Sequence, residues 1–315
     1  MNDTLSILDN LLDVASLNHQ MNTQQISSLK NPFAPFEPLL AAALTANVDA
    51  ALTEDVGSGD VTGLLVPADE IKTAELKVRE DAVLCGAPWF EAVMHRCDPR
   101  IRIEWCYAEG DFMKADSLVC RIHAPVRGLL TAERSAMNFL QLLSAVATIT
   151  RDYVRVIEGT QARILDTRKT LPGLRQAQKY AIRVGGGTNH RMALYDGVLI
   201  KENHIAAAGS IAAVMAHALA LPQSVPVQIE VENLAELEQA LAAGATSVLL
   251  DNFNLQAMRD AVRITSGRAL LEASGGINKA TLHDIAQTGV DRISSGSLTK
   301  DIRAIDFSLR VLDAQ

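Results

Sequence analysis

No two cysteines in this sequence have the C-x-x-C spacing of a zinc-ligand pair, which argues against a zinc site. The four cysteines are Cys85, Cys97, Cys106 and Cys120, and we expect free thiols in a reducing cytoplasm. No Lys or Arg precedes Lys30, so the basic start of a secretory signal is missing. No apolar run approaches the roughly 18 residues that a membrane helix needs. We therefore expect a cytoplasmic protein that does not enter a membrane.

Positive charge is also scarce over the chain as a whole. The formal net charge is -8 and the isoelectric point is near 5.4. A general nucleic-acid binder usually carries a basic face, so we expect no nucleic-acid partner. With 315 residues, of which 48% are hydrophobic, the chain can bury one large core or two modest ones.

The first half predicts a mixed domain over residues 36–150. Residues 1–35 form an extension to which we assign no role. Apolar residues recur at helical spacing over 36–53, and alternating segments between 61 and 125 predict a mainly antiparallel sheet. A long amphipathic helix is predicted over about 131–157, with Arg134 on its polar face.

The second half, residues 151–300, alternates short apolar strands with helical patterns. Six strands are predicted, in the segments "ARILDTRKT", "GVLIKENH", "VPVQIEVEN", "TSVLLDNF", "RALLEASGG" and "VDRISSGS". Helices are predicted at about 175–184, 205–220, 234–243, 255–265, 278–288 and 302–313. Such repetition indicates parallel strands with right-handed crossovers, which can curl into a barrel with fewer than the usual eight strands. The last helix, within 301–315, is expected to pack on the first domain.

Polar residues follow each predicted strand, at the end where α/β barrels carry their active sites. In strand order they are Thr167, Arg168 and Lys169; Lys201 and Glu202; Glu230 and Glu232; Asp251 and Asn252; Glu272, Ser274, Gly275 and Gly276; Ser294, Ser295 and Gly296. The predicted site therefore has a cationic side and an acidic side. The last two strand ends are small and rich in backbone N–H groups, which favours a phosphate there.

The charge near the first strand end is unlike that of the chain. From Gln161 to Arg191 there are seven Lys or Arg residues and a single acid, Asp166. Arginine forks suit carboxylates and phosphates, so the segment predicts a ligand with several negative charges. Glu230 and Asp251 would tolerate such an anion if Mg²⁺ or a cationic transition state lay between them. A phosphoribosyl donor meets that description.

The chain resembles quinolinate phosphoribosyltransferases from about residue 45 to its C-terminus. The resemblance rests on eight motifs in order: "EDVGSGDVT", "AERSAMNFLQLLSAVAT", "TRKTLPGLR", "GGGTNHR", "LIKENHI", "IEVEN", "LLDNF" and "LEASGGI". It implies an α/β open sandwich followed by an incomplete, six- to seven-stranded α/β barrel. It also implies formation of nicotinate mononucleotide, pyrophosphate and CO₂ from quinolinate and phosphoribosyl pyrophosphate, with Mg²⁺ and without an organic cofactor. The assembly implied is a homodimer or larger.

The resemblance also implies residue roles. Quinolinate would be bound by Arg134 from the neighbouring subunit and by Thr167, Arg168, Lys169, His190, Arg191 and Lys201. Catalysis would fall to Lys201 with Glu230 and Asp251, the two acids lying near the ribose and Mg²⁺. The 5-phosphate of the donor would be bound by Ser274, Gly275, Ser295 and Gly296.

Several alternatives stay open on the residues alone. The substrate could be nicotinate, or the chain could resemble a paralogue linked to molybdenum transport, although the number of cations favours a dicarboxylate. Lys201 could form a Schiff base in a lyase, or the protein could bind an anion without catalysis. His190 could brace Arg191 instead of contacting substrate, and the role of His204 is open. Lys179 is expected to support a loop or pair with an acid.

Overall fold

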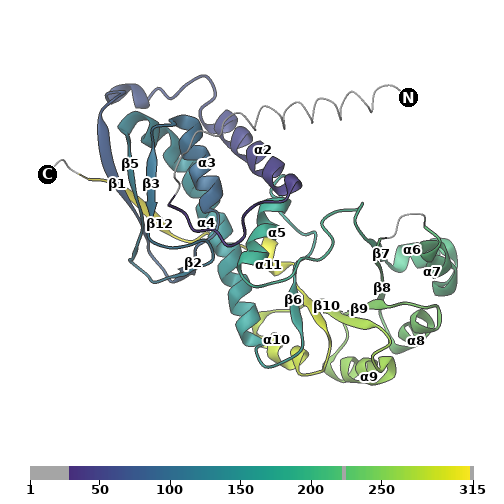
Figure 1. Ribbon diagram of the computed structural model, residues 1–315. Helices are drawn as coiled ribbons and strands as arrows, with labels where there is room; N and C mark the ends of the chain where they lie inside the picture. The colour runs from purple at the N-terminus through teal and green to yellow at the C-terminus, as the bar shows by residue number, and fades with distance from the viewer. Residues whose placement is uncertain (1–27, 222–224, 313–315) are drawn as a thin grey trace, which may run out of the picture.

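The computed structural model describes residues 28–221 and 225–312. The described residues form two main sheets with their helices and one short two-stranded sheet, and the long helix α4 joins the two main sheets (Figure 1). The predicted residues 1–27 of the extension lie outside the described range. None of the helices in the described part is both long enough and apolar enough to span a membrane.

The first domain is built on an antiparallel sheet with the strand order β12-β1-β5-β3. Its elements are β1 (Ile71–Val78), β3 (Arg102–Trp105), β5 (Leu118–Pro125) and β12 (Phe307–Val311), the short pair β2 (Ala82–Val83) and β4 (Phe112–Met113), the helices α2 (Pro38–Asp55) and α3 (Ala87–Cys97), and the 3-10 turn η1 (Gly63–Leu65). Buried and partly exposed residues alternate along β1 because one face of the sheet packs on the core. The predicted antiparallel sheet is confirmed.

The predicted C-terminal helix is wrong. Phe307–Val311 is a strand, and it pairs antiparallel with β1, with Phe307 opposite Val78. Phe307 is buried while Ser308 and Arg310 are not, which is the alternation of a strand at a sheet edge. With three apolar residues in so short a segment, the sequence does not separate a strand from a helical stripe. The chain end does return to the first domain, as expected.

Helix α4 (Val126–Val156) begins about five residues before its predicted start and ends as predicted. Its apolar stripe, which includes Leu140 and Leu143, is buried between α3 of the first domain and α5 of the second. In Figure 1 it runs from the upper domain into the lower one. The helix therefore fixes the orientation of the two domains.

The second domain contains an open parallel sheet of six strands in the order β6-β11-β10-β9-β8-β7. The strands are β6 (Arg163–Leu165), β7 (Val198–Ile200), β8 (Val227–Val231), β9 (Ser247–Asp251), β10 (Leu270–Ser274) and β11 (Arg292–Ser294). The first and last positions belong to β6 and β7, so the barrel is incomplete in the described residues. The six strands and the incomplete barrel are confirmed.

Helices follow these strands, and those after β6 to β10 lie where the sequence predicts them, whereas α11 was not predicted. They are α5 (Arg175–Val184), α6 (Glu202–Ala208), α7 (Ile211–Leu219), α8 (Leu234–Ala242), α9 (Leu255–Thr265), α10 (Lys279–Ala286) and α11 (Ser297–Lys300). The helix predicted over 205–220 is two helices, because Gly209 adopts φ +86° and ends the first of them. Asn233, Asn254 and Asn278 cap the helices after β8, β9 and β10, so each strand end turns sharply into its helix.

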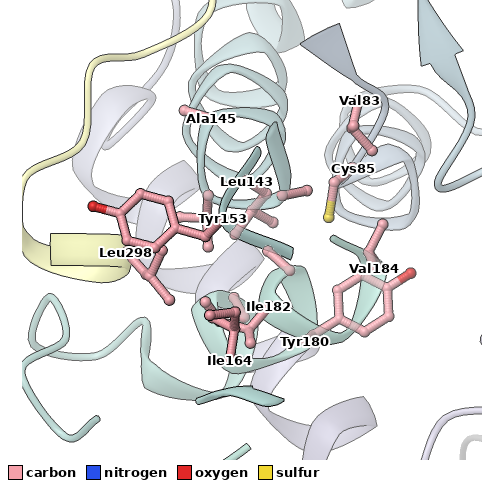
Figure 2. Close-up of a cluster of buried hydrophobic side chains, with 14 of the residues drawn as sticks. Val83, Cys85, Leu143, Ala145, Tyr153, Ile164, Tyr180, Ile182, Val184 and Leu298 are labelled. Carbon is pink, nitrogen blue, oxygen red and sulfur yellow. The ribbon is translucent and has the colours of Figure 1, made fainter. Parts of the chain in front are cut away.

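A continuous core joins the two domains around α4. Figure 2 shows Val83 and Cys85 of the first domain on one side of Leu143, with Ile182 of α5 and Ile164 of β6 on the other. The core thus positions β6 directly against helix α4. The predicted cations follow the C-terminal end of β6.

Tyr180 of α5 adds a polar bond to this junction. Its hydroxyl donates to Glu109 Oε1 over 2.9 Å, and the backbone N–H of Gly86 donates to the same oxygen over 2.8 Å. Burial raises the pKa of Glu109 to about 7, although these two hydrogen bonds act to lower it.

Candidate active site

Eight of the predicted site residues line one cavity of about 250 Å³ at the carboxyl ends of the parallel strands. They are Thr167, Arg168, Lys169, His190, Arg191, Lys201, Glu230 and Ser274. Leu199, Leu249, Glu272 and Ser294 complete the lining. Because parallel strands end at the same edge of the sheet, residues from distant parts of the sequence meet there.

A larger cavity of about 620 Å³ lies toward the other ends of the strands. Its lining includes Arg163 and Arg292, which begin β6 and β11. Active sites of α/β barrels lie at the carboxyl ends, so we assign the chemistry to the smaller cavity. His190 and Arg191 line both cavities and lie at the boundary between them.

The cationic side of the cavity lacks nearby acids. Among the described residues, no carboxylate lies within 4.0 Å of the charged nitrogens of Arg168, Lys169 or Arg191. The Nε of Arg168 is buried and has no hydrogen-bond partner. Burial and, next, the neighbouring guanidinium of Arg168 lower the pKa of Arg191. Two neighbouring cations that lack an ion-pair partner favour a bound anion.

Short-range bonds give these cations their positions. The Thr167 hydroxyl accepts a hydrogen bond from the backbone N–H of Lys169 over 3.1 Å, which turns the chain directly after β6. The Arg191 guanidinium donates to the carbonyl oxygen of Gly197 over 3.0 Å. Arg175 donates to the Thr170 hydroxyl over 3.1 Å, which supports the same loop.

Lys201 and Glu230 form an ion pair of 2.9 Å between Nζ and Oε2. They meet because β7 and β8 are neighbours in register, with Ile200 opposite Ile229. Glu230 is the more buried partner, with 13% of its side chain exposed against 44% for Lys201. An ammonium on a flexible stem can therefore leave this pair for a ligand anion while the carboxylate stays in place.

His204 does not line the cavity. Its Nδ1 accepts a hydrogen bond of 3.0 Å from the backbone N–H of Lys201, at the start of α6. This bond fixes the backbone from which the Lys201 side chain extends. His204 is a brace for Lys201 in this structure.

The remaining predicted residues surround the cavity without lining it. Asp251 lies in register with Ser274, and Asn252 donates to its carboxylate over 2.8 Å. A Cβ at Gly275 would lie 2.1 Å from Oδ1 of Asn252, so only glycine fits there. A Cβ at Gly296 would lie 2.8 Å from the Lys169 side chain. The end of the last strand therefore lies beside the cationic loop.

Two predicted residues lie apart from the cavity wall. Ser295 is buried, and its hydroxyl is 2.7 Å from that of Ser297. Arg134 is exposed on α4, outside the cavity of its own subunit. The expected contact of Arg134 with a neighbouring site stays a prediction.

Sequence reasoning expected Lys179 to support a loop or pair with an acid, but did not identify Asp166 as that acid. Lys179 and Asp166 are fully buried, with 2.5 Å between Nζ and Oδ1. Burial raises the pKa of Asp166 and lowers that of Lys179, while their mutual attraction opposes both shifts. Asp166 also accepts from the side chain of Asn189 over 2.6 Å and from the backbone N–H of His190 over 2.9 Å. The expectation that Lys179 pairs with an acid is confirmed.

Gln228 was missed, and Glu272 was named at a strand end without a role. Gln228 donates to Oε2 of Glu272 over 2.9 Å, and its Oε1 lies 2.8 Å from Nε2 of His190. The inward-facing parity of β8 and β10 could have indicated both residues, because Gln228 lies two positions before Glu230 and Glu272 two before Ser274.

The chain matches two family models over almost all of its described length. The C-terminal domain of quinolinate phosphoribosyl transferase matches residues 146–310, and the N-terminal domain matches residues 60–144. A probable nicotinate-nucleotide pyrophosphorylase [carboxylating] of Bacillus subtilis is 38% identical over 259 residues, or 82% of this chain and 90% of that protein. A chloroplastic nicotinate-nucleotide pyrophosphorylase [carboxylating] of Arabidopsis thaliana is 36% identical over 289 residues, or 85% of this chain and 82% of that protein.

A solved structure agrees with these sequences. The nicotinate-nucleotide pyrophosphorylase from Francisella tularensis is 43% identical and superposes with a TM-score of 0.84, covering 92% of this chain and 100% of its own. At this coverage the similarity extends across both domains. The chain belongs to the quinolinate phosphoribosyltransferase family.

Proposed function

We propose that this protein transfers the phosphoribosyl group of phosphoribosyl pyrophosphate to quinolinate and releases CO₂ and pyrophosphate, giving nicotinate mononucleotide. The observation that carries the proposal is the buried, unpartnered Nε of Arg168 beside Arg191. A buried donor without a partner is costly unless a ligand supplies an acceptor. A carboxylate is the acceptor that a guanidinium binds best.

The charge of the cavity supports a dicarboxylate in preference to a monocarboxylate. Arg168, Lys169, Arg191 and Lys201 face two acids, Glu230 and Glu272, so positive charge is in excess by two. Quinolinate carries two carboxylates on adjacent ring carbons, whereas nicotinate carries one. The neutral lining at Leu199 and Leu249 suits the face of an aromatic ring.

In this proposal the cations hold the ring so that its nitrogen meets the anomeric carbon of the donor. Glu230 stabilises the positive charge that develops on the ribose as pyrophosphate leaves. Lys201 moves from Glu230 toward the departing pyrophosphate and offsets the negative charge of that anion. N-ribosylation makes the ring nitrogen positive, so it stabilises the electron pair that stays on C2 as the bond to the 2-carboxylate breaks and CO₂ leaves. A proton from water then completes C2 of the product. The chain needs no organic cofactor for this step.

Magnesium fits the acidic side as a partner of the donor's diphosphate. Glu230 and Asp251 end neighbouring strands and face the same side of the sheet. No group of three or more His, Cys, Asp or Glu side chains in the described ranges could hold a metal ion alone. One or two carboxylates completed by phosphate oxygens is a common arrangement for Mg²⁺. Mg²⁺ would neutralise charge on the diphosphate.

We further propose that Arg134 completes the site of a second subunit in a homodimer or larger assembly. Its exposure on α4, outside its own cavity, supports this. Arg134→Ala and Lys201→Ala should each be inactive alone. Co-expressed in equal amounts, they should regain about a quarter of wild-type activity. About half of the dimers would contain one subunit of each variant, and each such dimer has one intact site of two. No recovery in demonstrated mixed dimers would contradict the exchange.

Substrate choice gives a direct test of the charge argument. Quinolinate should be used with a kcat/KM at least about 100-fold above that of nicotinate, since nicotinate leaves one set of buried donors unpaired. Both reactions can be followed through nicotinate mononucleotide formation with the same donor and Mg²⁺. Equal use of the two acids would contradict the assignment. The cytoplasmic location stays a prediction from the sequence.

A further inference from the structure

Three consecutive hydrogen bonds form a chain beside the candidate active site, from Arg191 through His190 and Gln228 to Glu272. The backbone N–H of Arg191 donates to Nδ1 of His190 over 2.8 Å. Nε2 of His190 lies 2.8 Å from Oε1 of Gln228, and Nε2 of Gln228 lies 2.9 Å from Oε2 of Glu272. The chain links the loop after α5 to β8 and β10.

The direction of every bond in this chain follows from its chemistry. A backbone N–H can only donate, so Nδ1 of His190 carries no proton. An imidazole must carry at least one proton, so Nε2 is protonated and donates to Gln228. The amide of Gln228 must then present its oxygen to His190 and its NH₂ group to Glu272. His190 is therefore the neutral Nε2–H tautomer.

The backbone of His190 is held as firmly as its ring. Its N–H donates to Asp166 over 2.9 Å, and its carbonyl oxygen accepts from Lys179 Nζ over 2.9 Å. All four polar atoms of His190 thus have partners within the protein.

The chain also lies where the two cavities meet. His190 lines both, Gln228 lines the larger one and Glu272 lines the smaller one. The side chain of Glu272 is buried, and its Oε1 has no hydrogen-bond partner. A buried carboxylate with one unsatisfied oxygen costs stability, so packing alone does not explain it.

We propose that Gln228 and Glu272 are positioning residues that hold His190 as the neutral Nε2–H tautomer and, through it, fix the backbone from which Arg191 reaches the substrate. The three side chains separate the active-site cavity from the larger cavity beneath it. This proposal rests on the proposed function for its kinetic consequences, but not for the state of His190.

The test combines a spectroscopic and a kinetic measurement on the full-length protein. Gln228→Leu keeps the approximate volume and removes both bonds. Glu272→Gln keeps an oxygen that can accept from Gln228 and serves as the conservative variant. Gln161→Leu is the matched control, because Gln161 is exposed and donates to Gly289 at the far end of β6.

Nitrogen NMR of the ligand-free protein, with His190 assigned by its loss in His190→Asn, should show the Nε2–H tautomer in the wild type, Glu272→Gln and Gln161→Leu. Gln228→Leu should lose that single tautomer. Its KM for quinolinate should rise about 10- to 100-fold with a smaller change in kcat, because a misplaced binding group weakens substrate positioning. Glu272→Gln should stay within about threefold of wild type on the same reasoning.

The Nδ1–H tautomer in the wild type would overturn the proposal, and so would a Gln228→Leu protein with unchanged tautomer and KM. If the wild type shows the Nε2–H tautomer but does not use quinolinate, the proposed function fails and the assignment of His190 stands.

Discussion

Arg168→Met is expected to lower kcat/KM for quinolinate by about 100- to 1,000-fold, the usual cost of removing a preorganised donor to an anion. Methionine keeps much of the side-chain length but cannot pair with a carboxylate. Most of the loss should appear in KM, because the contact forms on binding and persists in the transition state. Initial rates at varied quinolinate concentration measure the effect.

The same substitution should not destabilise the protein. In the ligand-free state the Arg168 Nε is buried without a partner, and its charge lies near Arg191. Removing both costs should leave the melting temperature unchanged or slightly higher, as often happens at functional sites. Arg163→Met is the control, because Arg163 is exposed at the opposite end of the same strand, β6. An Arg168→Met protein with normal KM would refute the role of Arg168.

Lys179→Met is expected to lower the free energy of unfolding by about 3–5 kcal/mol, the cost of breaking a buried ion pair. Lys179 Nζ contacts both Asp166 and the carbonyl oxygen of His190. Without it, the fully buried carboxyl of Asp166 lacks its cation and must either stay charged in a desolvated site or take up a proton. Urea unfolding followed by circular dichroism measures the loss.

Lys279→Met is the matched control for this prediction. Lys279 pairs with Asp152 over 2.7 Å, but both side chains are exposed. An exposed pair contributes about 0–1 kcal/mol, so the variant should unfold nearly as the wild type does. Equal losses in the two variants would show that burial of the Asp166 pair does not matter.

Local patterns were sufficient to predict the second domain. Each short apolar strand ends in a polar residue or is followed by one, and Asn233, Asn254 and Asn278 start helices at expected positions. Periodicity predicts such elements because burial on both faces of a parallel sheet requires apolar runs. Arg168, Lys169 and Arg191 reach one cavity for the same reason, since parallel strands share their carboxyl edge.

Sequence reasoning failed where the partner is distant in the chain. β12 was predicted as a helix because its strand partner, β1, lies more than 200 residues earlier. Gln228 and Glu272 were not assigned because parity gives the face of a strand but not the side chain that bonds across it. Glu272 ended a predicted strand, yet nothing in the sequence showed that it is buried beneath His190.

The most direct measurement of the central claim is the release of labelled CO₂ from quinolinate labelled in its 2-carboxylate. Purified protein is mixed with the labelled acid, phosphoribosyl pyrophosphate and Mg²⁺, and each component is omitted in turn. Release that requires the donor and Mg²⁺, and that is lost in Lys201→Ala, is the predicted result. A folded protein that binds quinolinate but releases no CO₂ with the complete mixture would contradict the account.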